Sequence, residues 1–369
     1  MERGLALKEK RGMSEVIATL IIILLVIVAI LVVWGVVRNV IDTGAEQITL
    51  DKFTINIELE KAVVSQNSID VTVKRNPGQG ELSGFRFVIS DGTNSQIIDS
   101  TATLSELEQK TISLNYVGIV KSVGVAPIIK QGTSTAVQEV KDTIEFSSKD
   151  AVKNTNGLVS WWRFEGNAND EMGLNDGTPM AGATLAQGRF GQGYKFDQTP
   201  ERIEIQDSAS LQLEQKNMTI IAWINIQDSS TLRPIMDKKN IFDPSGEGYG
   251  MLAQGINPTS FFPVFSVNFQ QAYSASSPHS AGQWIQVAAS QHINSTGSTK
   301  RIYTNGNFEG QSIFAPVAGD STGYNLIIGY YSGAFGDWTA NGTIDEVMIF
   351  SRSLSDQEIQ AIYNLDLND

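Results

Sequence analysis

The sequence predicts a mainly β protein in three parts: an N-terminal transmembrane helix, a small antiparallel β-sandwich and a larger β-sandwich. Two observations predict this fold class. A single uncharged apolar run, residues 16–37, is long enough to cross a bilayer as a helix. After residue 50, short apolar segments alternate with a period of two, and turns rich in Gly, Asn, Asp and Ser separate them, as is typical of antiparallel sheets.

The apolar run has 22 consecutive residues without a charge and would span about 33 Å as a helix. Basic residues precede it, and few positive charges follow closely beyond Arg38. Positive charges favour the cytoplasmic side, so we expect a cytoplasmic N-terminus and extracellular domains after about residue 40. Because no small-residue cleavage site follows the run, we expect it to stay attached as a single-pass anchor in the cell membrane.

A second motif, KRGMSE at residues 10–15, lies directly before the apolar run. This combination resembles the class III signal peptide of archaeal type IV pilins and archaellins. The resemblance implies that a prepilin peptidase cuts between Gly12 and Met13 and removes a leader, residues 1–12. The alternative is a plain signal anchor whose basic residues only set the topology.

The same resemblance assigns residues 13–47 to a hydrophobic transmembrane and assembly helix. Glu15 is the sole acid near the start of its apolar part. By resemblance to pilins, we expect Glu15 to take part in assembly with identical or other pilin subunits, which would place the protein in a surface filament.

Residues 48–146 form short alternating segments separated by the turns NPGQG and SDGTN. The pattern predicts an antiparallel β-sandwich. Its place after the helix resembles the β-rich head of archaeal pilins, and nothing in it indicates catalysis. The polar residues 147–156, SSKDAVKNTN, predict a linker.

Composition excludes several function classes. The net charge is -13, whereas a nucleic-acid surface needs clustered Lys and Arg, so we expect no nucleic-acid partner. There is no cysteine, so disulfides, cysteine nucleophiles and thiolate metal sites are excluded. The only histidines, His279 and His292, are too few and too far apart in sequence for a His-based triad or zinc site.

The last part of the chain, residues 157–369, holds a series of strand-like segments rich in aromatic residues. They are LVSWWRFEGNANDEMGLNDG at 158–177, MTIIAWINI at 218–226, QWIQVAASQ at 283–291, RIYTNGNFEG at 301–310 and GTIDEVMIFSRSLSDQEIQAIYN at 342–364. These segments and their order resemble the LamG-like, concanavalin A-like family. The resemblance implies a jelly-roll sandwich that recognises sugars or proteins.

Family members often hold a structural calcium ion, and the resemblance assigns Asp170, Asn175 and Asp345 to it. Carboxylate and amide oxygens are suitable Ca²⁺ ligands. The alternative is that Asn175-Asp176-Gly177 is a tight turn and that Asp345 caps a strand end.

We expect no enzyme activity. Retaining glycosidases need two carboxylates about 5 Å apart, and residues two apart on a strand share a face. Here Asp345 and Glu346 are adjacent and point to opposite faces, and no Glu-x-Asp-x-Glu strand is present.

A sugar site needs an exposed aromatic ring flanked by Asn, Asp or Gln. Two aromatic loops, 260–274 and 329–342, offer such sets. The candidate ligand-binding residues are Tyr273, Tyr331, Phe335 and Trp338. The alternative is that these rings pack beneath long loops.

Three sequons could accept N-glycans on an exported chain, although short patterns also arise by chance. They begin at Asn217, Asn294 and Asn341.

The leading hypothesis is therefore an archaeal cell-surface pilin-like subunit or adhesin that displays a domain for surface carbohydrate or glycoprotein. Two alternatives stay open: a signal-anchored monomeric surface lectin, and a glycoside hydrolase or lyase.

Overall fold

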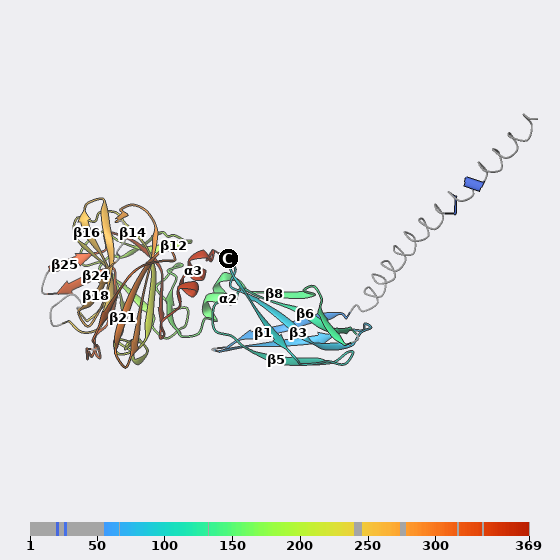
Figure 1. Cartoon of the computed structure of the whole chain (residues 1–369). Helices are drawn as coiled ribbons and strands as arrows, with labels where there is room; N and C mark the ends of the chain where they lie inside the picture. The colour runs from blue at the N-terminus through green and yellow to red at the C-terminus, as the bar shows by residue number, and fades with distance from the viewer. Residues whose placement is uncertain are drawn as a thin grey trace, which may run out of the picture.

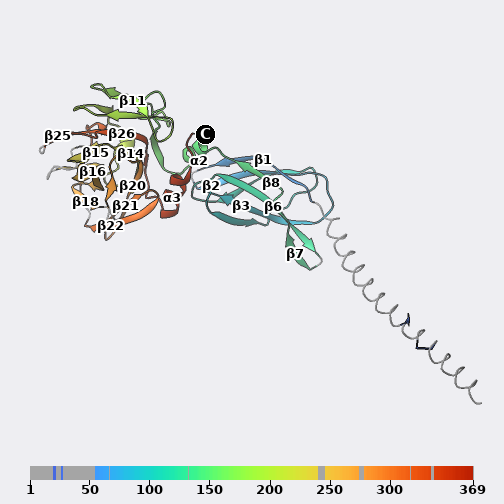
Figure 2. The same cartoon turned by 90° about the horizontal axis from the view of Figure 1, so that it is seen from above.

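The computed structural model describes residues 20–21, 26–27, 55–65, 67–131, 133–239, 246–273, 278–315, 317–333 and 336–368. Two β-sandwiches lie end to end within these ranges (Figures 1 and 2). The four N-terminal residues that are described, 20–21 and 26–27, are helical. Among the described residues, no helix has the length and hydropathy needed to cross a membrane. The leader and most of the predicted transmembrane helix, 13–47, lie outside the described residues.

The first sandwich is made of two antiparallel sheets. The smaller sheet has the order β1-β2-β5, with β1 Ile57–Val64, β2 Ser68–Arg75 and β5 Gln109–Asn115. The larger has the order β4-β3-β6-β7, with β8 on β6; its strands are β3 Leu82–Ser90, β4 Ser95–Ser100, β6 Ser122–Gln131, β7 Ser134–Val137 and β8 Asp142–Glu145. Alternate residues of β2 are buried, which is the period of two that the sequence predicts.

The segment expected to be a linker contains a short helix, α2, Ser148–Lys153. The Ser147 hydroxyl caps it by accepting the Asp150 N–H at 3.0 Å. Ala151 and Val152 are buried and belong to the same apolar cluster as Ile119 of the first sandwich. The two sandwiches are therefore joined by a packed helix.

The second sandwich also has two sheets, each of eight strands. We call one the pocket sheet, with the order β10-β13-β23-β15-β16-β17-β18 and β19 on β17. Its strands are β10 Gly177–Met180, β13 Arg202–Ile205, β15 Leu232–Lys238, β16 Tyr249–Asn257, β17 Ser260–Val267, β18 Gln270–Tyr273, β19 His279–Ser280 and β23 Leu326–Ile328.

We call the other the docking sheet, with the order β11-β12-β26-β14-β20-β21-β22 and β9 on β26. Its strands are β9 Leu158–Trp162, β11 Thr184–Gln187, β12 Gln192–Phe196, β14 Met218–Ile226, β20 Ile285–Asn294, β21 Gly297–Thr304, β22 Asn307–Phe314 and β26 Gly342–Phe350. A separate hairpin, β24 Tyr330–Gly333 and β25 Gly336–Thr339, a 3-10 turn, η1 Ala209–Leu211, and helix α3, Asp356–Asn364, complete the sandwich.

Local signals for three elements of this sandwich are confirmed. Nearly every residue of β14 is buried, as its apolar residues on both faces predict. Asn305 and Gly306 both have positive φ and connect β21 to β22, so the Asn-Gly pair forms the expected tight turn. Ser355 and Glu358 form a capping box at the start of α3.

The outer face of the docking sheet turns toward the first sandwich. Residues of β14 and β26 share one apolar cluster with α3 and α2. Side-chain hydrogen bonds also cross the boundary: Asn156 Nδ2 donates to Asn67 Oδ1 at 2.9 Å, and Asn364 Nδ2 donates to Thr93 Oγ1 at 3.1 Å. The docking sheet is thus covered, and the pocket sheet faces the opposite way, with β24 and β25 at the far end of the molecule (Figures 1 and 2).

The register of β1 shows where the chain enters the first sandwich. Ile57 pairs with Arg75 at one end of the strand, and Val64 pairs with Ile69 at the other. Asn67 lies in the turn beside Val64 and contacts Asn156, which directly precedes the second sandwich. The chain therefore enters the first sandwich at the end that lies away from the second.

Candidate functional site

The outer face of the pocket sheet carries a row of three residues from three neighbouring strands. Ile203 and Ile205 of β13 point into the core, so Glu204 between them points outward. Glu204 pairs with Ile327 of β23, and Ile327 pairs with Asp237 of β15. Two carboxylates therefore flank an apolar residue, two strand spacings or roughly 10 Å apart at their Cα atoms.

The β24–β25 hairpin lies over this face beside the row. Tyr331 and Trp338 are cross-strand partners, and their rings stack with centroids 5.1 Å apart and planes 16° apart. Both rings pack on Leu252 and Val264, which lie on β16 and β17. This apolar contact anchors the hairpin and places Tyr330 and Ser332 beside the row.

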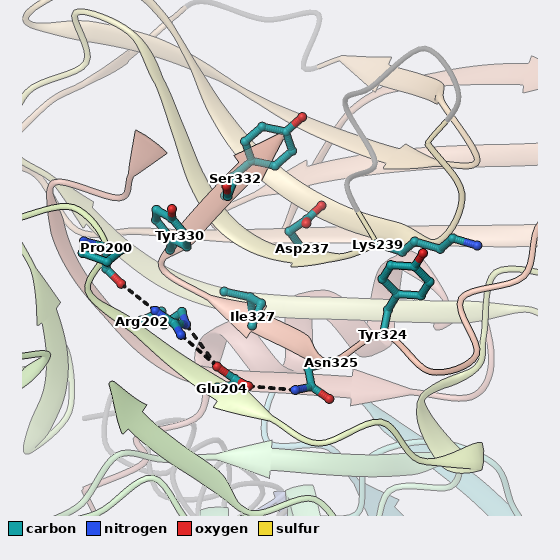
Figure 3. Close-up of a pocket in the computed structure, with 11 residues that line it drawn as sticks. Pro200, Arg202, Glu204, Asp237, Lys239, Tyr324, Asn325, Ile327, Tyr330 and Ser332 are labelled. Carbon is teal, nitrogen blue, oxygen red and sulfur yellow. Dashed lines mark hydrogen bonds and ion pairs between the residues drawn. The ribbon is translucent and has the colours of Figure 1, made fainter. Parts of the chain in front are cut away.

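These elements enclose a pocket of about 430 Å³, which falls within the roughly 300–1,000 Å³ typical of small-molecule sites. Its lining residues are Pro200, Arg202, Glu204, Asp237, Lys239, Tyr324, Asn325, Ile327, Tyr330, Tyr331 and Ser332, and we call it the tyrosine pocket. Figure 3 shows Tyr330 and Tyr324 on opposite sides, with Asp237 and Ile327 between them. Tyr324 is 48% exposed, so it is accessible to a ligand.

The polar groups on one side of the pocket hold one another in place. Arg202 Nε donates to Glu204 Oε2 at 3.1 Å, and its Nη1 donates to the Pro200 carbonyl at 3.2 Å. Asn325 Nδ2 donates to the other Glu204 oxygen at 2.8 Å (Figure 3). The Arg202 guanidinium also lies 5.9 Å from the Tyr330 ring centroid. A ligand would thus meet polar groups already oriented by neighbours.

The other side of the pocket is held by two lysines. Lys238 is fully buried, and its Nζ donates to Asp207 Oδ1 and to the Tyr324 carbonyl, both at 2.6 Å. Burial raises the pKa of Asp207, but the hydrogen bonds from Lys238 and the Gly323 N–H more than offset it and leave the pKa lowered. The second cation, Lys239, lies 4.8 Å from the Tyr324 ring centroid.

Lys239 is already paired with acceptors. Its Nζ donates to Glu247 and to the Asp320 carbonyl. The hydrogen bond with Glu247 raises the pKa of Lys239 and lowers the pKa of Glu247. Both cations of the pocket lining therefore have an acid partner in the protein.

The structure assigns different roles to the four predicted aromatic residues. Tyr331 lines the pocket but is 1% exposed, and Trp338 is half-buried, so both serve chiefly to anchor the hairpin. The Tyr273 side chain and Phe335 lie outside the described part of the chain. Tyr331 and Trp338 thus pack between their own hairpin and the pocket sheet.

Sequence reasoning missed the two rings that face the pocket, Tyr324 and Tyr330. Alternation along a strand gave a sequence signal for Glu204, which lies between Ile203 and Ile205. For Tyr330 it applies only once the structure shows that Tyr331 is buried. No local signal placed Asp237 in the same row.

The three predicted calcium ligands do not form a cation site. The Asp170 carboxylate accepts four backbone N–H groups, from Trp161, Met172, Leu174 and Asn175, at 2.8–3.2 Å. The Asn175 side chain bonds to the hydroxyls of Ser160, Ser208 and Ser210. Oxygens that accept this many donors do not suit a cation. In the described ranges, no group of three or more His, Asp or Glu side chains could hold a metal ion.

Asp345 lies in a separate buried acid pair. Its carboxylate accepts the backbone N–H groups of Arg189, Phe190 and Glu346 at 2.8–3.0 Å. Glu346, its neighbour, accepts the Trp161 indole N–H and pairs with Arg163. Both acids are fully buried and fully engaged, so they form a structural pair and no open catalytic site.

The three sequons differ in exposure. Asn294 is exposed in the β20–β21 turn, where its Oδ1 accepts the Thr296 N–H at 2.9 Å. Asn217 is half-buried and accepts the Ile293 N–H at 2.7 Å, and Asn341 is half-buried with a φ of 49°. Asn294 is the most accessible of the three. The processing and assembly residues Gly12, Met13 and Glu15 lie outside the described residues.

Comparison with known proteins supports the fold of the second sandwich. Residues 198–360 match the model of the concanavalin A-like lectin/glucanases superfamily, so a LamG-like, concanavalin A-like domain is supported for this part of the chain. No curated protein sequence matches the chain.

Two solved structures illustrate the level of structural similarity. Domain 4 of AbnA, a GH43 extracellular arabinanase from Geobacillus stearothermophilus, in complex with arabinotriose, has 15% identity and a TM-score of 0.44, covering 56% of this chain and 98% of that one. The binding domain of botulinum neurotoxin DC in complex with SialylT has 12% identity and a TM-score of 0.41, covering 56% of this chain and 51% of that one. These values are too low to indicate a ligand for this chain.

Proposed function

We propose that this chain is a membrane-anchored surface protein whose second sandwich binds carbohydrate in the tyrosine pocket. One observation carries the proposal: two tyrosine rings, Tyr324 and Tyr330, lie on opposite sides of an apolar floor, Ile327, that two carboxylates flank. A sugar ring has an apolar face that stacks on aromatic rings and a rim of hydroxyls that hydrogen-bond to carboxylates and amides. The pocket offers both kinds of surface at once.

The N-terminal part of the chain belongs to the same proposal. We take the apolar run, 16–37, as the anchor and the KRGMSE motif as a prepilin-type processing site, with pilin-like assembly as the consequence. The arrangement of the two sandwiches supports display. The chain enters the first sandwich at one end, and the β24–β25 hairpin, whose Tyr330 and Ser332 line the tyrosine pocket, lies at the far end of the second (Figure 1).

The binding proposal is tested on the full-length chain in detergent micelles. A glycan array identifies a bound sugar, and titration then compares wild type with Tyr330→Ala and Tyr324→Ala. Because stacking on an aromatic ring contributes about 1–3 kcal/mol, and about 1.4 kcal/mol is a factor of ten, we expect each change to weaken binding by roughly five-fold or more.

The matched control is Phe308→Ala. Phe308 is 44% exposed, which is similar to the exposed fraction of Tyr324, but it lies on β22, away from the pocket. It should bind like wild type. Loss of binding in the control, or unchanged binding in both tyrosine variants, would contradict the pocket assignment. A titration in chelator should match one in Ca²⁺, since the calcium donor set does not fit.

The row of three residues also favours a second candidate function, glycoside hydrolysis. Inverting glycosidases hold two carboxyl groups roughly 6.5–9.5 Å apart, and Glu204 and Asp237 share one face at a separation of this order. Both oxygens of the Glu204 carboxylate already accept hydrogen bonds, one from Arg202 and one from Asn325. New reducing ends from a bound oligosaccharide, absent with Glu204→Gln, would establish hydrolysis in place of simple binding.

A further inference from the structure

The charges around the tyrosine pocket are unevenly distributed. Five carboxylates lie in or beside its lining, against three basic groups. The acids are Glu204, Asp207, Asp237, Glu247 and Asp320, and the bases are Arg202, Lys238 and Lys239. The local balance is therefore negative, as it is for the whole chain at -13.

Each of the three cations already has an acid partner. Arg202 pairs with Glu204 at 3.1 Å, Lys238 with Asp207 at 2.6 Å, and Lys239 with Glu247. A ligand carboxylate could recruit one of them only by displacing that partner. The displaced protein carboxylate would then lose its charge-assisted hydrogen bonds beside a second negative charge.

The residues at the floor of the pocket also disfavour a negatively charged ligand. Asp237 and Glu204 lie on either side of Ile327, so a sugar ring over Ile327 directs opposite edges of its rim at two carboxylates. An ionised carboxylate accepts hydrogen bonds and donates none. Hydroxyl groups on the rim can donate to either acid, whereas a carboxylate or sulfate on the rim meets like charge on whichever edge it occupies.

From this geometry we infer that the tyrosine pocket selects uncharged, hydroxyl-rich glycans and rejects acidic sugars. The inference rests on the proposed carbohydrate binding and deepens it. Selectivity comes from the two flanking carboxylates, while the stacking energy comes from the tyrosine rings, so the two can be separated by experiment.

The test uses sugars that differ only at C6. Full-length protein in micelles is titrated with oligomers of galactose against galacturonate, glucose against glucuronate, and mannose against mannuronate. In the series that binds best, we expect the uronate to bind at least ten-fold more weakly at low salt. At 0.5 M NaCl the difference in affinity between the neutral sugar and its uronate should become smaller, because salt screens repulsion between partly exposed charges.

Glu204→Gln tests the role of the flanking carboxylates, because it removes one of the two negative charges and leaves Arg202 without its acid partner. We expect it to narrow the gap between the neutral sugar and its uronate several-fold. The matched control is Glu81→Gln, which removes one negative charge beside Lys130 in the first sandwich and should leave the gap unchanged. Thermal unfolding of each variant checks that it is folded, and the salt titration of wild type needs no variant.

The outcomes separate the two proposals. Uronate binding that equals or exceeds neutral binding and is lost in Tyr330→Ala would overturn the charge selectivity while leaving carbohydrate binding intact. The charge selectivity would also be overturned if the difference in affinity between the neutral sugar and its uronate changed neither with salt nor in Glu204→Gln. If no sugar binds in a Tyr330-dependent way, the proposed function itself fails.

Discussion

At the scale of single residues, the buried acids Asp345 and Glu346 together have more negative charge than the ion-pair partner of Glu346, Arg163, can balance. Burial raises the pKa of Asp345 to about 7, although the N–H groups of Phe190 and Arg189 act in the opposite direction. Burial, together with the charge of Asp345, raises the pKa of Glu346 well above its ordinary value. The pair therefore holds at least one proton under conditions in which the unfolded chain holds none.

This proton predicts a pH dependence of stability. A raised carboxyl pKa gives stability that is fully present below the unfolded value near 3.8 and is lost as the pH rises through about 7. Relative to Glu346→Gln, which cannot ionise at position 346, wild type should lose stability steadily from about pH 5 to pH 8, because folded Glu346 keeps its proton above its ordinary pKa of 4.5. Denaturant unfolding of both proteins across this range measures the free energy of unfolding at each pH. If that free energy changed with pH in the same way in both proteins, the prediction would be refuted.

At the scale of elements, the β24–β25 hairpin decides whether the pocket exists. It touches the pocket sheet through Tyr331 and Trp338, while Tyr330 on the same strand faces the ligand space. A two-stranded hairpin is marginally stable alone, so this apolar anchor must supply its order. Ligand binding and hairpin packing are thus linked through one pair of stacked rings.

Trp338→Ala should therefore reduce glycan binding about as much as Tyr330→Ala, although Trp338 is half-buried and packs on Tyr331. We expect faster hydrogen exchange at Tyr331–Gly333 and a loss of about 1–3 kcal/mol in the free energy of unfolding. The matched control is Trp284→Ala, which removes a half-buried ring packed beside the docking-sheet cluster. Equal loss of binding in both variants would point to general destabilisation.

At the scale of the whole molecule, the two sandwiches are joined by contacts that limit their relative motion. Ile119 of the first sandwich is buried in the cluster that contains α2, α3 and the docking sheet. Ile119→Asp should open this junction, because an unpaired carboxylate is costly in an apolar cluster. Limited proteolysis should then cut between residues 147 and 157 while both sandwiches stay intact. Val117→Asp, at a neighbouring position that is exposed, should stay resistant, and equal cleavage of the two would argue against a packed junction.

The processing hypothesis also belongs to this scale. Replacing Gly12 by Ile should block removal of residues 1–12, because the peptidase implied by the resemblance requires a small residue at the cut. Gly4→Ile changes a glycine of the same leader and should leave processing intact. Intact mass of the membrane-extracted protein distinguishes a start at Met1 from a start at Met13. A wild-type protein that keeps its leader would leave the signal-anchor alternative.

Much of the second sandwich could be predicted because its signals are local. The Asn305-Gly306 turn, the Ser355–Glu358 capping box and the apolar strand β14 each depend on residues within a few positions of one another. Helix α2 was missed for a physical reason: its two apolar residues, Ala151 and Val152, are too few to signal a helix, and tertiary packing supplies its stability.

The sequence by itself determined the class of the molecule: an apolar N-terminal run followed by alternating strands without cysteine. Only the tertiary structure decided the site. Glu204, Asp237 and Ile327 are far apart in the chain and meet because the registers of β13, β15 and β23 align them. Strand register depends on how whole strands bury their apolar faces, which no short stretch of sequence encodes.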